Sequence, residues 1–308
     1  MKYYLGNGIT YMSSSDNSRI CGVGTALITP FKADGSLDPD TFERFIEFQI
    51  EQGVNFLVPL GTTGETPTLS ESEQDEVVRL ALRVAGERVP VVAGCTSNNT
   101  REAVERGRRF AALGLRHILS ACPYYNKPTP GGILEHFRTI HRETGLQIVL
   151  YNIPGRTASS ATPEMIARLT EEGVIFAVKD ATGSISNVQR VCQLTGDALT
   201  MLSGDDETTL PLMAVGGRGV ISVASNLVPR AMRDWVDTID RGDYPTARNH
   251  LKRLLPLFQA CFVESNPIPV KGGAGILGLM EPRYRLPITP PAPETLEAMR
   301  RALQPFMS

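Results

Sequence analysis

Residues 174–182 read VIFAVKDAT and lie between Gly173 and Gly183. An apolar run of this length, bounded by glycines, predicts a strand that is buried inside the protein. The run contains one lysine, Lys179, near its carboxyl end. The stretch therefore predicts a buried strand that carries an ammonium group.

Lys179 has two interpretations on this strand. A buried ammonium group loses its hydration, so it is costly unless it has a partner or a catalytic task. Burial lowers the pKa of a lysine and frees its lone pair to attack a carbonyl carbon, which is what a Schiff-base catalyst requires. The alternative is a lysine at the end of a strand that reaches solvent or pairs with Asp180. The strand alone does not decide between them.

Similar apolar runs alternate with amphipathic helical stretches along most of the chain. The predicted strands are 22–31, 55–61, 90–95, 117–123, 147–153, 175–181, 199–204 and 219–225. The predicted helices are 39–52, 70–86, 98–113, 130–143, 163–170, 186–194, 207–215 and 229–240. Eight such βα units without a long linker predict an α/β protein with a closed (β/α)8 barrel, the TIM barrel. An open doubly wound sheet is the alternative, but no glycine-rich phosphate loop follows the first strand.

The pattern divides the chain into three parts. Residues 1–20 are polar and lack the apolar centre of a secretory signal, so we expect a flexible N-terminal extension. Residues 21–241 hold the barrel. Residues 242–308 contain further helical stretches at 244–264, 269–279 and 293–307, which predict a C-terminal helical appendix packed on the barrel.

Composition excludes several classes of protein. The 308 residues include 31 basic and 33 acidic side chains, so the net charge of −2 gives no basic surface for nucleic acid or an anionic membrane. No stretch is apolar for long enough to cross a bilayer. The 5 cysteines are scattered and the 4 histidines lack the spacing of a zinc site, so we expect reduced thiols, a cytoplasmic location and no metal. Cys95 and Cys122 follow predicted strands, and we interpret them as small buried side chains.

Polar and unusual residues gather at the carboxyl ends of the predicted strands. They are 61–65 (GTTGE), 123–126 (PYYN), 151–156 (YNIPGR), Lys179, 203–206 (SGDD) and 221–226 (ISVASN). Loops at this end of the strands build the active site of a (β/α)8 barrel. The opposite ends, at 51–53, 86–88 and 216–218, have only turn residues and surface charge. This asymmetry predicts an enzyme.

Each group has a chemical use and a structural alternative. Thr62 and Thr63 offer hydroxyls and backbone N–H groups to a carboxylate, although their flanking glycines also suit a simple turn. Tyrosine hydroxyls pass protons when they lie beside an amine, whereas Tyr124 and Tyr125 could both be packing aromatics. Arg156 follows a Pro-Gly turn and can bind a carboxylate through two hydrogen bonds, or it is a surface arginine.

Taken together and in order, these motifs resemble the 4-hydroxy-tetrahydrodipicolinate synthase family, also called dihydrodipicolinate synthase. The family belongs to the pyruvate-dependent aldolase and lyase superfamily. The resemblance runs from about Val23 to residues 285–287. The stretches that carry it are GTTGE at 61–65, YYNKP at 124–128, YNIPGRT at 151–157, VKDATG at 178–183, SGDD at 203–206 and NPIPVK at 266–271.

The resemblance implies a role for each candidate residue. Lys179 forms the Schiff base with pyruvate, and the turn at Thr62 and Thr63 holds the pyruvate carboxylate. Tyr151 lies over Lys179 and forms a proton relay with Thr63 and Tyr125. Arg156 binds the carboxylate of the second substrate, aspartate semialdehyde. The backbone at Gly204 and Ile221 shapes the pocket, and no cofactor is needed.

The resemblance also implies an assembly and a route of regulation. In this family the tyrosine that corresponds to Tyr125 is lent across a dimer interface, which implies a homo-oligomer, usually a tetramer formed as a dimer of dimers. Relatives that are inhibited by lysine bind it at that interface, and Asn98, Glu102 and Tyr124 match residues used there. Glu71 and Gln74 stand where many sensitive bacterial members have histidines.

Two other functions are compatible with some of these residues, and one further motif is misleading. A related aldolase or lyase could keep Lys179 but act on a 2-keto-3-deoxy sugar acid, 4-hydroxy-2-oxoglutarate or N-acetylneuraminate. A catalytically silent relative could bind an oxo acid only. Residues 273–278 match the dinucleotide pattern GxGxxG but lack a preceding strand, so close helix packing explains their small residues better.

Overall fold

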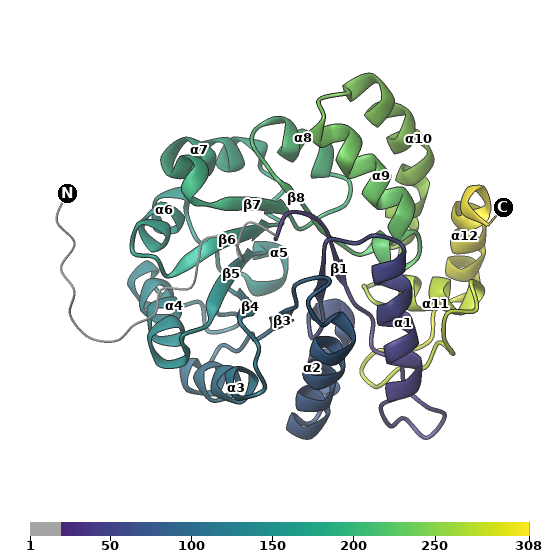
Figure 1. Cartoon of the computed structure of the whole chain (residues 1–308), viewed down its shortest axis with the longest axis horizontal. Helices are drawn as coiled ribbons and strands as arrows, with labels where there is room; N and C mark the ends of the chain where they lie inside the picture. The colour runs from purple at the N-terminus through teal and green to yellow at the C-terminus, as the bar shows by residue number, and fades with distance from the viewer. Residues whose placement is uncertain (1–19, 308) are drawn as a thin grey trace.

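The computed structural model describes residues 20–307, and its centre is one sheet of eight parallel strands. The strand order is β2-β1-β8-β7-β6-β5-β4-β3. A parallel bridge between Leu57 and Val91, with a hydrogen bond from the Gly94 amide to the Pro59 carbonyl, joins the two ends of this order. The sheet therefore closes into a barrel (Figure 1), and the predicted (β/α)8 fold is confirmed. The strands are β1 (Gly22–Ala26), β2 (Phe56–Val58), β3 (Val92–Gly94), β4 (His117–Ala121), β5 (Gln147–Asn152), β6 (Ile175–Asp180), β7 (Thr200–Ser203) and β8 (Gly219–Ser222).

Helices follow the strands and form the outer ring of the barrel (Figure 1). Several begin at the sequence signals expected of them. Ser70 accepts a hydrogen bond from the Glu73 amide while the Glu73 carboxylate accepts one from the Ser70 amide, which is a complete capping box. The helices are α1 (Pro39–Glu51), α2 (Glu71–Ala85), α3 (Thr100–Ala112), α4 (Pro130–Thr144), α5 (Pro154–Thr157), α6 (Pro163–Glu171), α7 (Ile185–Thr195), α8 (Thr209–Ala214) and α9 (Pro229–Asp240).

The strands are shorter than the sequence predicts, always at the carboxyl end. After β2, for example, the chain leaves the sheet at Leu60, which has a left-handed φ of 59°. The residues beyond it form a 3₁₀ turn at Thr62–Gly64 instead of extending the strand. Apolar residues therefore continue past the last hydrogen bonds of the sheet into the loops at the carboxyl ends of the strands.

Two apolar layers lie on either side of the sheet. The inner layer fills the barrel with side chains from the strands, including Phe56, Val149, Leu202 and Ile221. The outer layer, which includes Trp235 and Phe258, lies between the strands and the helices. Ile20, just before β1, is fully buried with the inner layer, whereas the rest of the expected N-terminal extension lies outside the described residues.

The C-terminal segment contributes α10 (Tyr244–Ala260), α11 (Ile268–Ile276) and α12 (Pro293–Leu303). α10 packs on α9, and α12 contacts both α10 and α11. The GxGxxG pattern lies in and just after α11. A Cβ added at Gly273 would lie 2.8 Å from a Leu227 methyl group and 3.1 Å from Met299, so close packing accounts for this glycine.

Candidate active site

Lys179 lies on β6 and its side chain is only 5 % exposed. The register of the sheet places it beside Tyr151 of β5, and its Nζ lies 4.2 Å from the centroid of the Tyr151 ring. Asp180 does not pair with it, because that carboxylate accepts hydrogen bonds from the Thr182 amide and hydroxyl. The alternative of a solvent-facing or Asp180-paired lysine is therefore wrong.

Burial changes the acid–base behaviour of Lys179. Desolvation lowers its pKa to about 8, against the opposing attraction of Asp206, while Arg156 lowers the pKa further and Asp205 raises it. A larger fraction of the amine is consequently unprotonated near neutral pH than for an exposed lysine. Burial also raises the pKa of the Tyr151 phenol well above its ordinary value, so this hydroxyl keeps its proton.

A cavity of about 850 Å³ opens above Lys179. Most of the residues singled out in the sequence line this one space, although they come from the ends of five different strands. They are Thr62, Thr63, Tyr124, Tyr151, Arg156, Lys179 and Gly204. The asymmetry between the two ends of the predicted strands therefore corresponds to a real concave site.

The turn after β2 presents its two threonines differently. Thr62 is exposed to the cavity, whereas Thr63 is buried and its Oγ1 lies 2.9 Å from Nδ2 of Asn266. The turn is held from below, since Thr29 donates a hydrogen bond of 2.7 Å from its hydroxyl to the Gly64 carbonyl. Hydroxyl and amide donors in a fixed turn are suited to binding a carboxylate.

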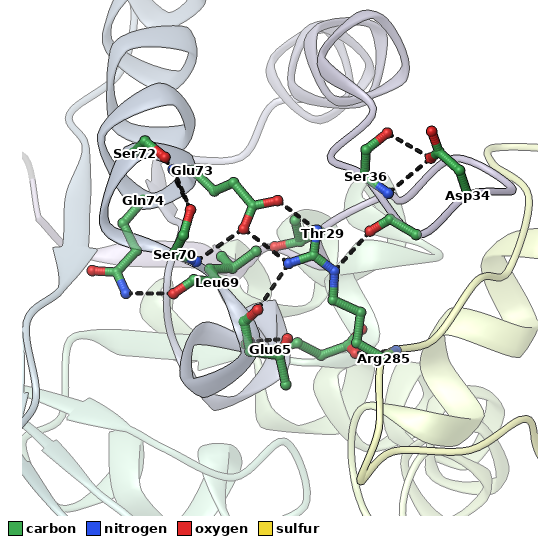
Figure 2. A network of polar contacts seen from close by, with 12 residues as sticks. Thr29, Asp34, Ser36, Glu65, Leu69, Ser70, Ser72, Glu73, Gln74 and Arg285 are labelled. Carbon is green, nitrogen blue, oxygen red and sulfur yellow. Dashed lines mark hydrogen bonds and ion pairs between the residues drawn. The ribbon is translucent and has the colours of Figure 1, made fainter.

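Glu65, directly after the turn, anchors it to the C-terminal segment. Its backbone is left-handed (φ 55°), and its buried carboxylate lies 2.6 Å from Nζ of Lys271 on α11. Arg285 adds a second connection because it donates to Glu73 of α2 (2.9 Å) and to the Thr68 carbonyl (2.8 Å). Figure 2 shows Arg285 between Glu65 and Glu73. These charges fix the position of the threonine turn relative to Lys179.

Gly204 and Arg156 complete the walls of the cavity. A Cβ at position 204 would lie 3.1 Å from Cγ of Lys179 and 2.9 Å from Cβ of Ala181, so glycine is needed where β7 approaches the lysine. Arg156 lies on α5, a single turn that the sequence did not predict, and its exposed guanidinium borders the cavity. Ile221 lies on β8, fully buried in the inner layer of the barrel rather than in the cavity lining.

A family model described as the dihydrodipicolinate synthetase family matches residues 19–305. The chain belongs to the dihydrodipicolinate synthetase family. The 4-hydroxy-tetrahydrodipicolinate synthase of Koribacter versatilis is 48% identical over 277 residues, which are 90% of this chain and 92% of that protein.

Two solved structures of this family are also similar to this chain in fold. The dihydrodipicolinate synthase of Aquifex aeolicus has a TM-score of 0.90 at 38% identity and covers 93% of this chain and 98% of its own. The dihydrodipicolinate synthase of Cyanidioschyzon merolae with lysine bound has a TM-score of 0.90 at 37% identity and also covers 93% and 98%. The fold and family inferred from the sequence motifs are thus confirmed.

Two expected site residues of this family member differ sharply in exposure. Tyr124 lines the cavity and is 37% exposed, whereas Tyr125 is 87% exposed and has a left-handed φ of 69°. Tyr125 therefore does not reach Lys179 within one chain. Near Tyr124, Asn98 donates to its carbonyl (3.4 Å), and Glu102 accepts a hydrogen bond from Ser97 (2.9 Å).

Asp206 and Lys271 are buried charges for which sequence reasoning gave no role. Asp206 is 1% exposed, and its carboxylate accepts hydrogen bonds from the Val223 (3.1 Å) and Ala224 (2.9 Å) amides. Burial raises its pKa to about 6. For Lys271 the signal available in the sequence was a charge in an apolar context, since it follows Ile268-Pro269-Val270 much as Lys179 follows its own apolar run. Asp206 lies in the polar stretch 203–208 (SGDDET) and has no such signal.

The cysteines and the metal-ligating side chains give no sign of redox or metal chemistry in residues 20–307. Cys95 and Cys122 are buried, and burial raises the pKa of each thiol to about 12, in agreement with the interpretation of both as packing residues. Within residues 20–307, no three His, Cys, Asp or Glu side chains gather in a way that could hold a metal ion. In the same range, no helix is both long and apolar enough to span a bilayer.

Proposed function

We propose that this chain condenses pyruvate with L-aspartate 4-semialdehyde to give 4-hydroxy-tetrahydrodipicolinate through an imine on Lys179. The observation that carries the proposal is the buried amine of Lys179 beside Tyr151, at the base of a cavity with hydroxyl donors on one side and a guanidinium on another. The family and the names of its most similar relatives support the same reaction.

The first half of the reaction uses pyruvate. The unprotonated Lys179 amine attacks the C2 carbonyl carbon, and loss of water gives the imine. The donors at Thr62 and Thr63 bind the pyruvate carboxylate, and the backbone at Gly204 shapes the space around it. A proton then leaves the pyruvate methyl group, and the bonding pair forms the enamine. The covalent imine is the electron sink for this step, so the proposal includes no cofactor.

The second half uses the semialdehyde, whose carboxylate Arg156 binds through two hydrogen bonds. The enamine carbon attacks the aldehyde carbon, and the aldehyde oxygen takes a proton from a relay of Tyr151, Thr63 and Tyr125. The amino group of the semialdehyde then attacks the imine carbon, expels Lys179 and closes the ring. The enzyme is regenerated with its amine free.

The choice of aldehyde tests this function against the related aldolases. We expect kcat/KM for aspartate semialdehyde to exceed that for glyoxylate, glyceraldehyde or N-acetylmannosamine by about 100-fold, because only the semialdehyde pairs its carboxylate with Arg156 and cyclises. Steady-state rates with pyruvate and each aldehyde measure this preference. Arg156→Met should reduce this preference for aspartate semialdehyde. A higher kcat/KM with a sugar-derived aldehyde than with aspartate semialdehyde would assign the chain to the sugar-acid aldolases instead.

The exposed position of Tyr125 supports the proposal that the site is completed by a second copy of the chain. A tyrosine that is 87% exposed on a left-handed turn, next to the cavity-lining Tyr124, is available to a neighbour. We therefore propose a homo-oligomer, a tetramer arranged as a dimer of dimers, in which Tyr125 enters the relay of the partner. The free thiols of the described residues support the proposal that the protein works in a reducing cytoplasm. The proposed reaction belongs to lysine and diaminopimelate biosynthesis.

L-Lysine is proposed as an inhibitor that binds near Asn98, Glu102 and Tyr124, as the lysine-bound relative suggests. Because Glu71 and Gln74 stand where many sensitive members have histidines, we expect inhibition only at millimolar L-lysine. Titration of the condensation rate with L-lysine, with D-lysine as the control, measures it. An unchanged rate at millimolar L-lysine would remove the regulatory proposal and leave the catalytic one intact.

A further inference from the structure

Asn266 reaches the threonine turn from a distant part of the chain. It lies between α10 and α11, is 5% exposed, and donates from Nδ2 to Oγ1 of Thr63 across 2.9 Å. Its own Oδ1 has no hydrogen-bond partner among residues 20–307. The single hydrogen bond of this buried amide is therefore the one to Thr63.

This contact sets the direction of the Thr63 hydroxyl. An amide nitrogen carries only donor hydrogens, so Thr63 Oγ1 must accept this hydrogen bond. The hydroxyl proton of Thr63 is then left to point away from Asn266. Because Thr63 and Tyr151 line the same cavity as Lys179, that proton is available to the reacting groups.

The backbone around Asn266 is held by other contacts. The Ile268 amide donates to the Ser265 carbonyl (2.9 Å), and the Lys271 amide donates to the Pro267 carbonyl (3.1 Å). The Lys271–Glu65 ion pair connects α11 to the same turn independently. The Asn266 side chain is therefore not required to hold the segment in place, and its polarity is free to serve Thr63.

We propose that Asn266 is a positioning residue that orients the Thr63 hydroxyl for proton transfer to and from the pyruvate-derived enamine. The inference rests on the proposed function, because it needs the imine on Lys179. It makes the C-terminal segment part of the active site, in agreement with the cavity lining, which includes residues 262, 265–267, 287 and 288 of that segment.

Asn266→Asp tests the polarity with almost no change in shape. An ionised carboxylate accepts hydrogen bonds only, so it captures the Thr63 hydroxyl proton instead of donating to the oxygen. We expect kcat to fall about 100-fold, the scale of general acid–base catalysis, while KM for pyruvate changes by less than about threefold. Asn266→Ala removes the donor without adding an acceptor, so it should lower kcat by a smaller factor than Asn266→Asp. The exposed Asn249→Asp on α10 is the charge-matched control.

Exchange of the pyruvate methyl hydrogens for deuterium, followed by NMR, measures enamine formation without the second substrate. We expect Asn266→Asp to slow this exchange about as much as kcat. In a Thr63→Val background there is no hydroxyl to orient, so Asn266→Asp should then cost less than about threefold. The role of Asn266 would be overturned if the losses of kcat in the two substitutions were additive, or if Asn266→Ala lost more kcat than Asn266→Asp. It would also be overturned if Asn266→Asp left the rate of methyl-hydrogen exchange within threefold of that of the unsubstituted chain. No exchange in the unsubstituted chain would overturn this role and the imine mechanism together.

Discussion

Lys179→Arg lowers kcat/KM for the condensation by at least about 10⁴-fold, because a guanidinium keeps the positive charge but cannot form the imine with pyruvate. In the proposed mechanism Nζ of Lys179 becomes covalently bound to pyruvate, so no neighbouring group replaces it. Steady-state assay of the purified variant with pyruvate and aspartate semialdehyde measures this fall in kcat/KM. The substitution preserves a long cationic side chain, which limits the effect on packing.

Two controls make the Lys179 result specific. Lys252→Arg on the exposed face of α10 repeats the chemistry of the substitution away from the cavity and should leave the rate within twofold, about the scale expected of a surface change. Circular dichroism and thermal melting report whether Lys179→Arg is folded. A folded Lys179→Arg protein that keeps more than about 1% of the activity would contradict the imine mechanism.

Lys271→Met lowers the free energy of unfolding by about 3–5 kcal/mol, because it leaves the Glu65 carboxylate buried without its partner. The two side chains are 0% and 1% exposed, and Nζ of Lys271 also lies 4.1 Å from the centroid of the Phe31 ring. Desolvation lowers the pKa of Lys271 to about 8 against the opposing effect of Glu65, which reflects how fully this amine is removed from water. Urea unfolding followed by circular dichroism measures the loss.

A compensating variant separates the buried charge from simple packing. Lys271→Met combined with Glu65→Gln removes the unpaired charge, so we expect it to recover part of the lost free energy. Lys252→Met, on the surface of α10, should change the free energy of unfolding by less than about 0.5 kcal/mol. If Lys271→Met were no more destabilising than Lys252→Met, Glu65 and Lys271 would not hold the turn as described.

The barrel and the position of Lys179 were predictable because both follow from local patterns. Short apolar runs identified the strands, and the parallel register then placed Tyr151 beside Lys179. The strand ends were harder, because apolar character continues beyond the last hydrogen bond, as it does at Leu60 after β2. The single turn of α5 was missed because four residues carry no helical periodicity.

The support of the site was not predictable from local patterns. Glu65 and Lys271 are 206 residues apart in the sequence, and Thr63 and Asn266 are 203 apart, so no periodicity relates them. Glu65 and Lys271 do have an unusual sequence context, because Glu65 follows a glycine turn and Lys271 lies among apolar residues and glycines. Only the fold brings Glu65 to Lys271 and Asn266 to Thr63.

Trapping with borohydride reports directly whether Lys179 forms an imine with pyruvate. The protein is incubated with pyruvate, the imine is reduced to a stable amine, and peptide mass spectrometry locates the adduct. Lys271 is the internal competitor, since it is also buried and has a similarly lowered pKa of about 8, but it is paired with Glu65 and does not line the cavity. We expect one pyruvate adduct per chain, on Lys179; an adduct on Lys271 or no adduct at all would rule out the imine on Lys179.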